Sequence, residues 1–251
     1  MVASEGSVDV VLLTKNSDRA LKKCVESIYR TVPVNQLIVV DGYSTDKTLD
    51  IMKEFGEKYR NVKIVFDRGN RATARQRGIA AVETEWFIFV DSDVILCKDW
   101  YKKAQKFVNE GVGAVWGTEV WSTIRTAATL KLFLEITRKI FEIRGGTHDT
   151  LIKTELVRDI KIPTKLHVYE DAYIKDWIEH KGYLVIPCYD PFCIHFRPSN
   201  VWTFKGSIGL MAESLSLGDT RVIAKLLAAY GFYTVYAINQ LAHSNKNRAG
   251  K

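Results

Sequence analysis

The chain has 251 residues, of which 47% are hydrophobic, 26% charged and 11% aromatic. These proportions are typical of a globular protein and exclude a disordered or fibrous chain, and the length suffices to bury a sizeable core without a stabilising metal or disulfide. A formal net charge of +7 suits an anionic ligand, a nucleic acid or an acidic membrane surface, and the sign alone does not choose among them.

The cysteines and the N-terminus both favour an intracellular setting. The cysteines, at positions 24, 97, 188 and 193, include no Cys-x-x-Cys pair, so packed thiols are expected rather than a structural zinc site. The segment Met1–Ser7 is polar and lacks the basic and apolar regions of a signal peptide. We therefore expect a cytoplasmic protein, or one on the cytosolic face of a membrane.

The first half of the chain alternates strand and helix patterns. Apolar runs predict strands over Val8–Leu13, Leu37–Val40, Val62–Phe66 and Trp86–Val90. Between them, apolar stripes predict helices through Leu21–Ile28, Leu49–Phe55 and Ala72–Val82. Uninterrupted apolar strands are typical of a parallel sheet that is covered by helices on both faces.

The alternation ends near Ala114. A β-rich piece, Ala114–Trp121, precedes an amphipathic helix over Thr126–Ile143, and an irregular region follows. A helix is then predicted from Glu170 to about Gly182, with a strand over Tyr183–Ile186. Because no linker composition separates the halves, we expect them to share one sheet.

Polar residues follow the predicted strands. In an open α/β sheet, ligands bind beyond the carboxyl ends of the strands, near the point where strand order reverses. The residues at these ends are Thr14–Asn16, Asp41–Ser44, Asp67–Asn70 and Asp91–Asp93. If the first, second and fourth strands are neighbours, as right-handed crossovers allow, Asp41 and the Asp91/Asp93 pair converge on one crevice.

Two of these segments suggest specific ligands. Asp91 and Asp93 offer hard oxygen ligands that suit Mg²⁺ or Mn²⁺ bound to a phosphate, although an Asp-rich turn would look the same. Arg68–Arg77 carries four arginines before an apolar helix face. A diphosphate would bind such arginines together with the helix N-terminus, and a solvated basic face is the alternative.

Several other motifs are absent from the sequence. The run Gly111–Gly117 enters a predicted strand rather than a helix, so it fails as a dinucleotide-binding loop. There is no P-loop and no Gly-x-Ser-x-Gly turn. The basic residues follow no nucleic-acid-binding module, so no nucleic-acid partner is expected.

Four segments in order resemble the signatures of family 2 glycosyltransferases with the GT-A fold. They are Val-Asp-Val-Val-Leu-Leu-Thr-Lys-Asn at 8–16, Ile-Val-Val-Asp-Gly-Tyr-Ser-Thr-Asp-Lys-Thr at 38–48, Ala-Arg-Gln-Arg-Gly-Ile at 74–79 and Phe-Val-Asp-Ser-Asp at 89–93. Tyr-Glu-Asp-Ala-Tyr at 169–173 is similar to the family's Glu-Asp element. The resemblance implies an α/β fold with a Rossmann-like, mostly parallel central sheet flanked by helices, and a C-terminal helical extension.

The same resemblance assigns roles to individual residues. The nucleotide-sugar pocket would include Thr14, Asn16, Asp41, Arg71, Arg75 and Asp91. Asp93 resembles the ligand of a diphosphate-bound Mn²⁺ or Mg²⁺, and His195 lies where some members place a further metal or phosphate contact. Asp171 resembles the catalytic base. The family would then transfer one sugar, with inversion, from a nucleotide diphosphate sugar to an acceptor hydroxyl or phosphate.

The family pattern also divides the chain. Residues 1–115 would form the nucleotide-sugar-binding half, residues 116–200 the acceptor-binding and catalytic half of the same domain, and residues 201–251 a helical C-terminal segment. The Gln-x-x-Arg-Trp element of processive polysaccharide synthases is absent, which favours transfer of a single sugar.

The sequence gives the least information about the acceptor substrate. The helix over Thr126–Ile143 and the segment Val222–Leu241 mix aromatic, apolar and basic residues, and the apolar core of the latter is too short to cross a bilayer. Such segments suit peripheral membrane contact and a polyprenyl-linked acceptor, or equally a packed core and a homo-oligomer interface with a glycan acceptor.

Two other functions compete with this interpretation. A sugar nucleotidyltransferase shares the layered α/β build but would carry a Gly-rich basic loop after the first strand, where Thr14-Lys15-Asn16 stands. A non-catalytic nucleotide-sugar-binding or glycan-binding protein would have lost Asp93 or Asp171, and both are present.

Overall fold

The computed structural model describes residues 6–121, 146–196, 208, 212–213 and 215–218. The chain divides into two compact units, Met1–Val201 and Trp202–Lys251, and all the elements below belong to the first. The predicted helices over Thr126–Ile143 and Val222–Leu241 lie outside the described residues, so those predictions stay open. Within the described residues, no helix is both long enough and apolar enough to cross a membrane.

The first unit is built on one eight-stranded sheet with the order β3-β2-β1-β4-β7-β6-β8-β5. The strands are β1 Val8–Thr14, β2 Val34–Asp41, β3 Val62–Phe66, β4 Trp86–Asp91, β5 Val94–Leu96, β6 Val112–Trp121, β7 Asp149–Lys153 and β8 Leu184–His195. Strand β1 pairs in parallel with both β2 and β4, an arrangement that right-handed crossovers allow.

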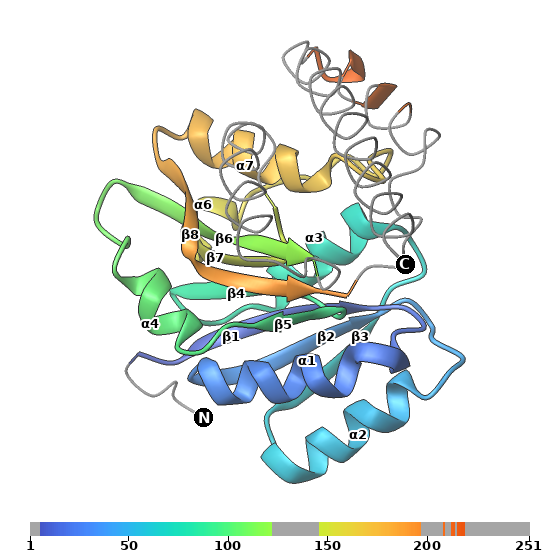
Figure 1. The fold of residues 1–251 in the computed structure, drawn as a ribbon. Coiled ribbons are helices and arrows are strands. Elements are labelled where there is room, and N and C mark those ends of the chain that lie inside the picture. The colour runs from blue at the N-terminus through green and yellow to red at the C-terminus, as the bar shows by residue number, and fades with distance from the viewer. Residues whose placement is uncertain (1–5, 122–145, 197–207, 209–211, 214, 219–251) are drawn as a thin grey trace, which may run out of the picture. The chain divides into compact units, whose positions relative to one another are not determined.

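Helices cover both faces of this sheet. They are α1 Asp18–Thr31, α2 Thr48–Tyr59, α3 Arg71–Ala81, α4 Trp100–Gln105, α6 Thr154–Val157 and α7 Glu170–His180. Helices α1 and α2 lie on one face, and α3, α6 and α7 lie on the other (Figure 1). Because both faces are covered, consecutive residues of a strand are all buried, and Val10, Val11 and Leu12 are each 0% exposed. The predicted α/β fold with a mostly parallel, helix-flanked sheet is confirmed.

The residues of β4 show how the two faces are filled. Ile88 and Val90 pack into the core on the side of α1 and α2. Phe87 and Phe89 point the other way, and their rings meet edge to face at 5.0 Å between centroids. Alternation along the strand therefore places one apolar layer on each side of the sheet.

The prediction of irregular structure before Glu170 is wrong for part of that region. It contains β7 and α6, and β7 joins the sheet antiparallel between β4 and β6. Asp149–Lys153 is polar at both ends, so it shows neither an uninterrupted apolar run nor the alternation that identifies a strand. Its place in the sheet comes from pairing on both sides, which buries Leu151 and Ile152. Strand β5 and helix α4 are too short to be recognised by pattern.

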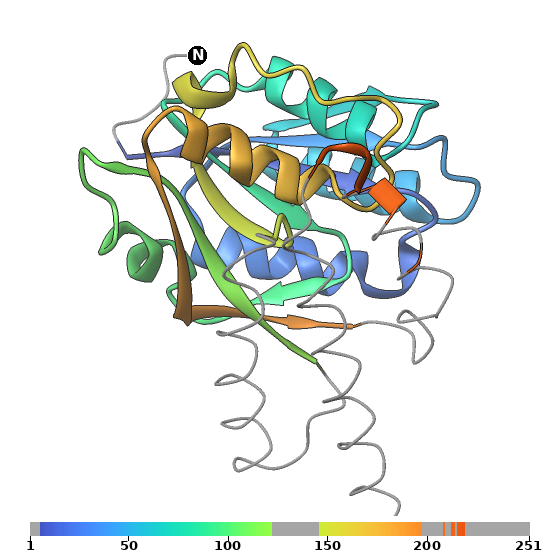
Figure 2. The same ribbon diagram turned by 90° about the horizontal axis from the view of Figure 1, so that it is seen from above.

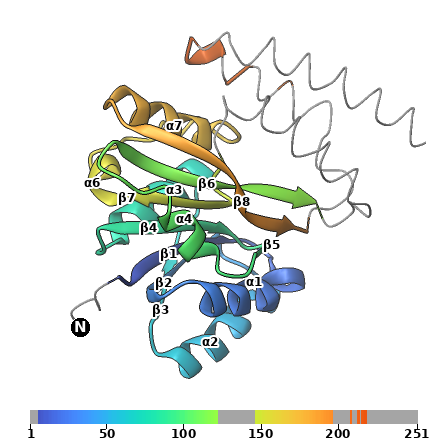
Figure 3. The same cartoon turned by 60° about the vertical axis from the view of Figure 1, so that its left-hand side comes forward.

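Strand β8 is longer than the predicted segment Tyr183–Ile186. It runs beside β6 as far as His195, and the pairing shifts register between Gly117 and Thr118 (Figure 3). Pro187 and Pro191 interrupt the β-forming pattern in the sequence. The predicted strand therefore ends before the observed strand does.

Strand register brings several carboxyl ends to one edge. Thr14 of β1 lies opposite Asp41 of β2, and Leu13 lies opposite Asp91 of β4. At the far end of the sheet, His195 of β8 pairs with Val94 of β5, one residue beyond Asp93. The chain thus returns His195 to the turn that follows β4.

Candidate active site

Asp41 is a buried carboxylate with a complete set of donors. It is 0% exposed. Its Oδ2 accepts hydrogen bonds from Thr14 Oγ1 at 2.7 Å and Ser44 Oγ at 2.7 Å, and its Oδ1 accepts one from the Ser44 backbone N–H at 2.8 Å. These bonds fix the carboxylate at the end of β2, and they bring the predicted pair Thr14 and Asp41 together.

Asn16 supports the turn after β2. Its Oδ1 accepts a hydrogen bond from the Thr45 backbone N–H at 2.8 Å, and its own N–H donates to Ser44 Oγ at 2.9 Å. Its φ of 50° is a left-handed conformation that asparagine tolerates better than most residues. The structure therefore gives Asn16 a role in shaping the loop, while its predicted contact with a nucleotide stays a prediction.

The arginines of the α3 segment do not form one basic face. Arg77 pairs with Asp67 at 2.7 Å, and the Arg68 guanidinium lies 4.6 Å from the centre of the exposed Tyr43 ring. Arg71 is exposed at the first residue of α3. Arg75 is buried, lies 4.8 Å from the centre of the Phe89 ring, and pairs with Asp91. Each arginine thus has different surroundings.

Asp91 is held ionised by its neighbours. Arg75 Nη2 donates to Asp91 Oδ1 at 2.9 Å. Burial disfavours the charged form of Asp91, but the Arg75 guanidinium, followed by His195, outweighs burial and holds the pKa of that carboxyl well below its usual range. Asp91 is therefore an anion that is already partly neutralised from inside the protein.

Asp91, Asp93 and His195 form a group that could hold a metal ion. Each offers a ligand atom within 4.8 Å of the others. His195 Nε2 lies 2.9 Å from Asp93 Oδ1, and the Asp93 side chain is 40% exposed, so the group opens to solvent on the Asp93 side. Two carboxylates with one imidazole suit a divalent cation such as Mn²⁺, and the residues present fit the predicted group.

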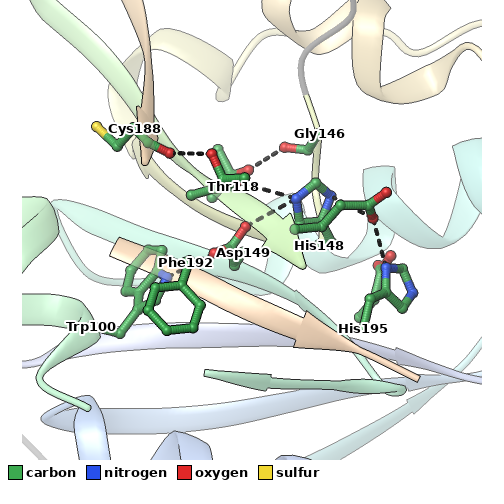
Figure 4. Close-up of polar contacts among 12 residues, drawn as sticks. Trp100, Thr118, Gly146, His148, Asp149, Cys188, Phe192 and His195 are labelled. Carbon is green, nitrogen blue, oxygen red and sulfur yellow. Dashed lines mark hydrogen bonds and ion pairs between the residues drawn. The ribbon is translucent and has the colours of Figure 1, made fainter. Parts of the chain in front are cut away.

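Three functional candidates behind this group carried no recognisable sequence motif. Glu119 of β6 lies 2.7 Å from His195 Nδ1 through its Oε2. Asp149 begins β7 and His148 directly precedes it, and Figure 4 shows His148 between His195 and Asp149. The only sequence signal was the presence of charged residues in β-forming surroundings, which does not by itself reveal burial.

Asp149 is the innermost member of this set. Its Oδ2 accepts a hydrogen bond from Trp100 Nε1 at 2.8 Å, and its Oδ1 lies 3.1 Å from His148 Nε2 (Figure 4). Burial raises the pKa of Asp149 to about 6, although His148 and the Trp100 N–H act in the opposite direction. A buried carboxylate of this kind is costly unless it is hydrogen-bonded, and here Trp100 satisfies Oδ2 whereas Oδ1 has no hydrogen-bond partner among the described residues.

His148, Asp149 and Cys193 also lie close enough to share a metal ion. All three side chains are buried, and burial raises the pKa of the Cys193 thiol well above its ordinary value. His148 Nε2 is already engaged with Gly117 O and Asp149. This second group is therefore explained as packing and hydrogen bonding.

Asp171 lies in the first turn of α7 and is only half-buried. Its Oδ1 accepts a hydrogen bond from the Ala172 backbone N–H at 2.7 Å. It lines a small pocket together with Trp116, Ile174 and Lys175. Asp171 is therefore a half-buried carboxylate at the wall of a small pocket.

Glu170, beside Asp171, is buried instead. Burial, reinforced by the neighbouring Asp171 charge, raises the pKa of Glu170 to about 7, and Arg75 and Arg71 act against that rise. The segment before α7 runs along α3, where the Ile162 N–H donates to Gln76 Oε1 at 2.9 Å (Figure 2). The start of α7 is thus linked to α3, and through Arg75 to Asp91.

Comparison with known protein families decides the family. The profile described as "Glycosyl transferase family 2" matches residues 9–145, which is more than half of the chain. The chain belongs to glycosyl transferase family 2. The resemblance carried by the four sequence segments is thereby confirmed.

Curated relatives of this family 2 chain are distant and much longer. It is 26% identical over 190 residues to a poly(ribitol-phosphate) beta-glucosyltransferase of Bacillus spizizenii, covering 67% of this chain and 30% of that protein. It is 26% identical over 178 residues to the poly(ribitol-phosphate) beta-N-acetylglucosaminyltransferase TarS of Staphylococcus aureus, covering 64% and 30%. The chain spans about a third of the length of these relatives.

Solved structures share the fold. The mannosyltransferase PcManGT of Pyrobaculum calidifontis, in complex with GDP-Man and Mn²⁺, superposes with a TM-score of 0.62 at 19% identity, over 82% of this chain and 63% of that one. S. aureus TarS 1–349 in complex with UDP-GlcNAc gives 0.62 at 21% identity, over 77% and 59%. The predicted GT-A fold of this family 2 chain is confirmed by these likenesses.

Proposed function

We propose that the chain transfers one sugar from a nucleoside diphosphate sugar to an acceptor hydroxyl or phosphate, with inversion at the anomeric carbon. The observation that carries this proposal is the meeting of Asp91, Asp93 and His195 at one place. The described part of the chain also places Thr14 and Asp41 at the neighbouring strand ends. Family membership and the nucleotide sugars named with two solved neighbours support it.

The donor would bind along the ends of β1, β2 and β4. Asp41 is fully buried and is held by Thr14 and Ser44, so it would support the nucleoside pocket by fixing the ends of β1 and β2. Arg71, exposed at the first turn of α3, offers positive charge for phosphate, and the α3 N-terminus adds backbone N–H groups. Arg75 would act indirectly, because it holds Asp91 in place.

The leaving group would be received by the group at the end of β4. Asp91, Asp93 and His195 would hold a divalent cation, and their oxygen and nitrogen atoms favour Mn²⁺ or Mg²⁺. When bound, such a cation neutralises negative charge on a departing diphosphate. Asp93 is the more exposed carboxylate of the two, so it faces the incoming donor more openly than Asp91 does.

Asp171 would be the general base. It would accept the proton of the acceptor hydroxyl while the acceptor oxygen forms its bond to the sugar C1. The bond from C1 to the diphosphate oxygen breaks in the same displacement, and its electron pair leaves on the diphosphate. The half-buried position of Asp171 at the wall of a pocket, in the first turn of α7, supports this role.

The geometry of the site does not favour the two alternative functions. A sugar nucleotidyltransferase needs a Gly-rich basic loop after β1, whereas Thr14-Lys15-Asn16 here forms hydrogen bonds with the turn after β2. A non-catalytic binding protein has no need for an accessible carboxylate at Asp171. The nature of the acceptor, membrane contact and oligomerisation stay predictions, since the segments that suggested them lie outside the described residues.

The test is a donor panel. Hydrolysis of UDP-, GDP- and dTDP-sugars would be measured with Mn²⁺ or Mg²⁺, using water as the acceptor. We expect turnover of one nucleotide class, and we expect Asp171→Asn to lower turnover by about 10²- to 10⁴-fold, as loss of a general base does, while donor binding persists. The matched control is Asp159→Asn, which removes an exposed carboxylate paired only with Lys181 among the described contacts.

Two outcomes would contradict the proposal. If no donor class is bound or hydrolysed with either metal, a nucleotide-sugar function is wrong. If Asp171→Asn turns over the donor at the wild-type rate, Asp171 is not the base.

A further inference from the structure

Glu119 is an unusual residue for the interior of a sheet. It lies on β6, which pairs with β7 on one side and β8 on the other, and it is 3% exposed. Removing a carboxylate from water costs several kcal/mol unless partners replace the lost hydration. A buried glutamate at this position therefore needs a partner, and the structure supplies one on β8.

That partner is His195. Glu119 Oε2 lies 2.7 Å from His195 Nδ1, and His195 is itself 3% exposed. His148 Nδ1 lies 4.0 Å from the same oxygen, which is beyond hydrogen-bonding distance. The short contact of Glu119 is thus with His195.

The other nitrogen of the same ring faces the candidate metal group. His195 Nε2 lies 2.9 Å from Asp93 Oδ1 and belongs with Asp91 and Asp93 to the group whose ligand atoms lie within 4.8 Å of one another. The imidazole therefore bridges a carboxylate inside the sheet and two carboxylates at its edge. Figure 4 shows His195 at the outer end of this polar set.

The two contacts of His195 differ in which atom must carry a proton. An ionised carboxylate can only accept a hydrogen bond, so Glu119 requires the proton on Nδ1. Asp93 Oδ1 lies within hydrogen-bonding distance of Nε2, so a cation at this group takes the place of a proton on Nε2 and binds through the lone pair of that atom. Histidine ligands of metals commonly donate their second N–H to a carboxylate in this way, which fixes both the tautomer and the ring orientation.

We propose that Glu119 is a positioning residue that holds His195 in the Nδ1–H tautomer, so that Nε2 is presented to a divalent cation at Asp91 and Asp93. This inference rests on the proposed function, because it assumes that the cation binds there. Glu119 itself touches neither cation nor substrate and acts through His195.

The test measures Mn²⁺ affinity directly, by the electron paramagnetic resonance signal of free Mn²⁺, with the whole chain and saturating UDP or GDP. Glu119→Met keeps the length of the side chain but removes the acceptor, and we expect Mn²⁺ to bind about 10- to 100-fold more weakly. Glu119→Gln keeps an oxygen that can accept from Nδ1, and we expect a smaller loss. The order wild type, Gln, Met would identify the hydrogen bond as the cause.

The matched control is Asp9→Asn. Asp9 is also a fully buried carboxylate, but it bonds Asn35 and the backbone N–H groups of Glu83 and Thr84, at the opposite end of β1 from the site. We expect this variant to lose stability without losing Mn²⁺ affinity. A general effect of removing a buried charge would weaken Mn²⁺ binding in both variants, and that result would overturn the proposal.

A second measurement is made on the wild-type protein and does not depend on the folding of a Glu119 variant. Ring ¹⁵N NMR with saturating Mg²⁺ and UDP or GDP distinguishes a ring that carries its proton on Nδ1 from one that carries it on Nε2, and the His195 signal is identified by its loss in His195→Gln. We expect the Nδ1–H pattern. The Nε2–H pattern, or a Glu119→Met variant that binds Mn²⁺ as tightly as wild type, overturns the role of Glu119 alone. Failure of the wild-type protein to bind Mn²⁺ with either nucleotide overturns the proposed cation as well.

Discussion

Asp91 and Asp93 are one residue apart in the chain, yet they meet different neighbours. Asp91 ends β4 and pairs with Arg75 from the helical layer of α3. Asp93 lies in the turn toward β5 and meets His195 from β8. One carboxylate is therefore neutralised by a fixed cationic side chain and the other lies next to an imidazole, which leaves Asp93 the better placed of the two to bind an added cation.

Glu170 leads to a prediction about pH. Its folded-state pKa is raised from 4.5 to about 7, chiefly by burial. Between these values the folded chain holds a proton that the unfolded chain has released, so its contribution to stability is present below about pH 4.5 and is lost as pH rises toward about 7. We expect Glu170→Gln, which stays neutral, to remove this loss, which amounts to at most about 1.4 kcal/mol for each pH unit across that interval.

The measurement is urea unfolding of both proteins between about pH 5 and about pH 8. The difference in unfolding free energy should grow in favour of Glu170→Gln as pH rises. Since other titrating groups are common to both proteins, the difference isolates Glu170. A difference that does not change with pH would show that Glu170 has an ordinary pKa in the folded chain.

At the scale of elements, helix α3 shows how a helix can begin in a segment rich in arginine. Arginine in a first turn opposes the helix dipole unless an anion is near. Here Asn70 caps the helix in a reciprocal capping box with Thr73, and Thr73 Oγ1 also donates to Asp67 at 2.7 Å. Asp67 and Asp91 are thus anions supplied by the protein, which pair with Arg77 and with Nη2 of Arg75, and Arg71 stays exposed.

The packing of α3 on β1 leads to a second prediction. A Cβ added at Gly78 would lie 2.4 Å from Val11 Cγ1, whereas one added at Gly56 of α2 would meet only Val62 Cβ at 3.8 Å. We expect Gly78→Ala to destabilise the fold by about 1 to 3 kcal/mol through overpacking. Gly56→Ala should stabilise it by about 0.5 to 1 kcal/mol through helix propensity.

The two variants are matched, since each adds one methyl group to a helix. Their denaturant midpoints, measured at constant slope, should move in opposite directions. Equal shifts would mean that α3 can move away from β1 at little cost, and that its position does not depend on the close approach of Gly78.

At the scale of the molecule, the candidate site draws on both halves of one sheet. Asp41 and Asp91 come from the strands β2 and β4, and His195 and Glu119 from β8 and β6, with β7 joining the two sets. The division into a donor half at residues 1–115 and an acceptor half at residues 116–200 stays a prediction. Ligand binding at the site should nevertheless stabilise both sets of strands together.

This expectation can be measured by ligand linkage. A donor nucleotide with Mn²⁺ at about 100 times its Kd should add about 2.7 kcal/mol to the unfolding free energy, which raises Tm by roughly 5 to 10 °C for a domain of this size. Hydrogen exchange should slow in β1 and β8 alike. Slowing confined to β1–β4 would show that His195 does not take part in binding.

The sequence by itself determined the elements whose signals are local. The strand Val62–Phe66 was predicted with its observed bounds, and Thr14, Asp41, Asp91 and Asp93 were identified because each follows an apolar run that ends abruptly. Their arrangement along one sheet edge then follows from the right-handed connections of a parallel sheet.

Only the tertiary structure decided the partners of these residues. Glu119 and His195 are 76 positions apart, and Arg75 reaches Asp91 from a different layer. Strand β7 was missed because Asp149–Lys153 becomes a strand only when β4 and β6 pair with it on both sides. Such contacts depend on which segments the fold places side by side, and no periodicity within a short segment encodes the identity of a distant neighbour.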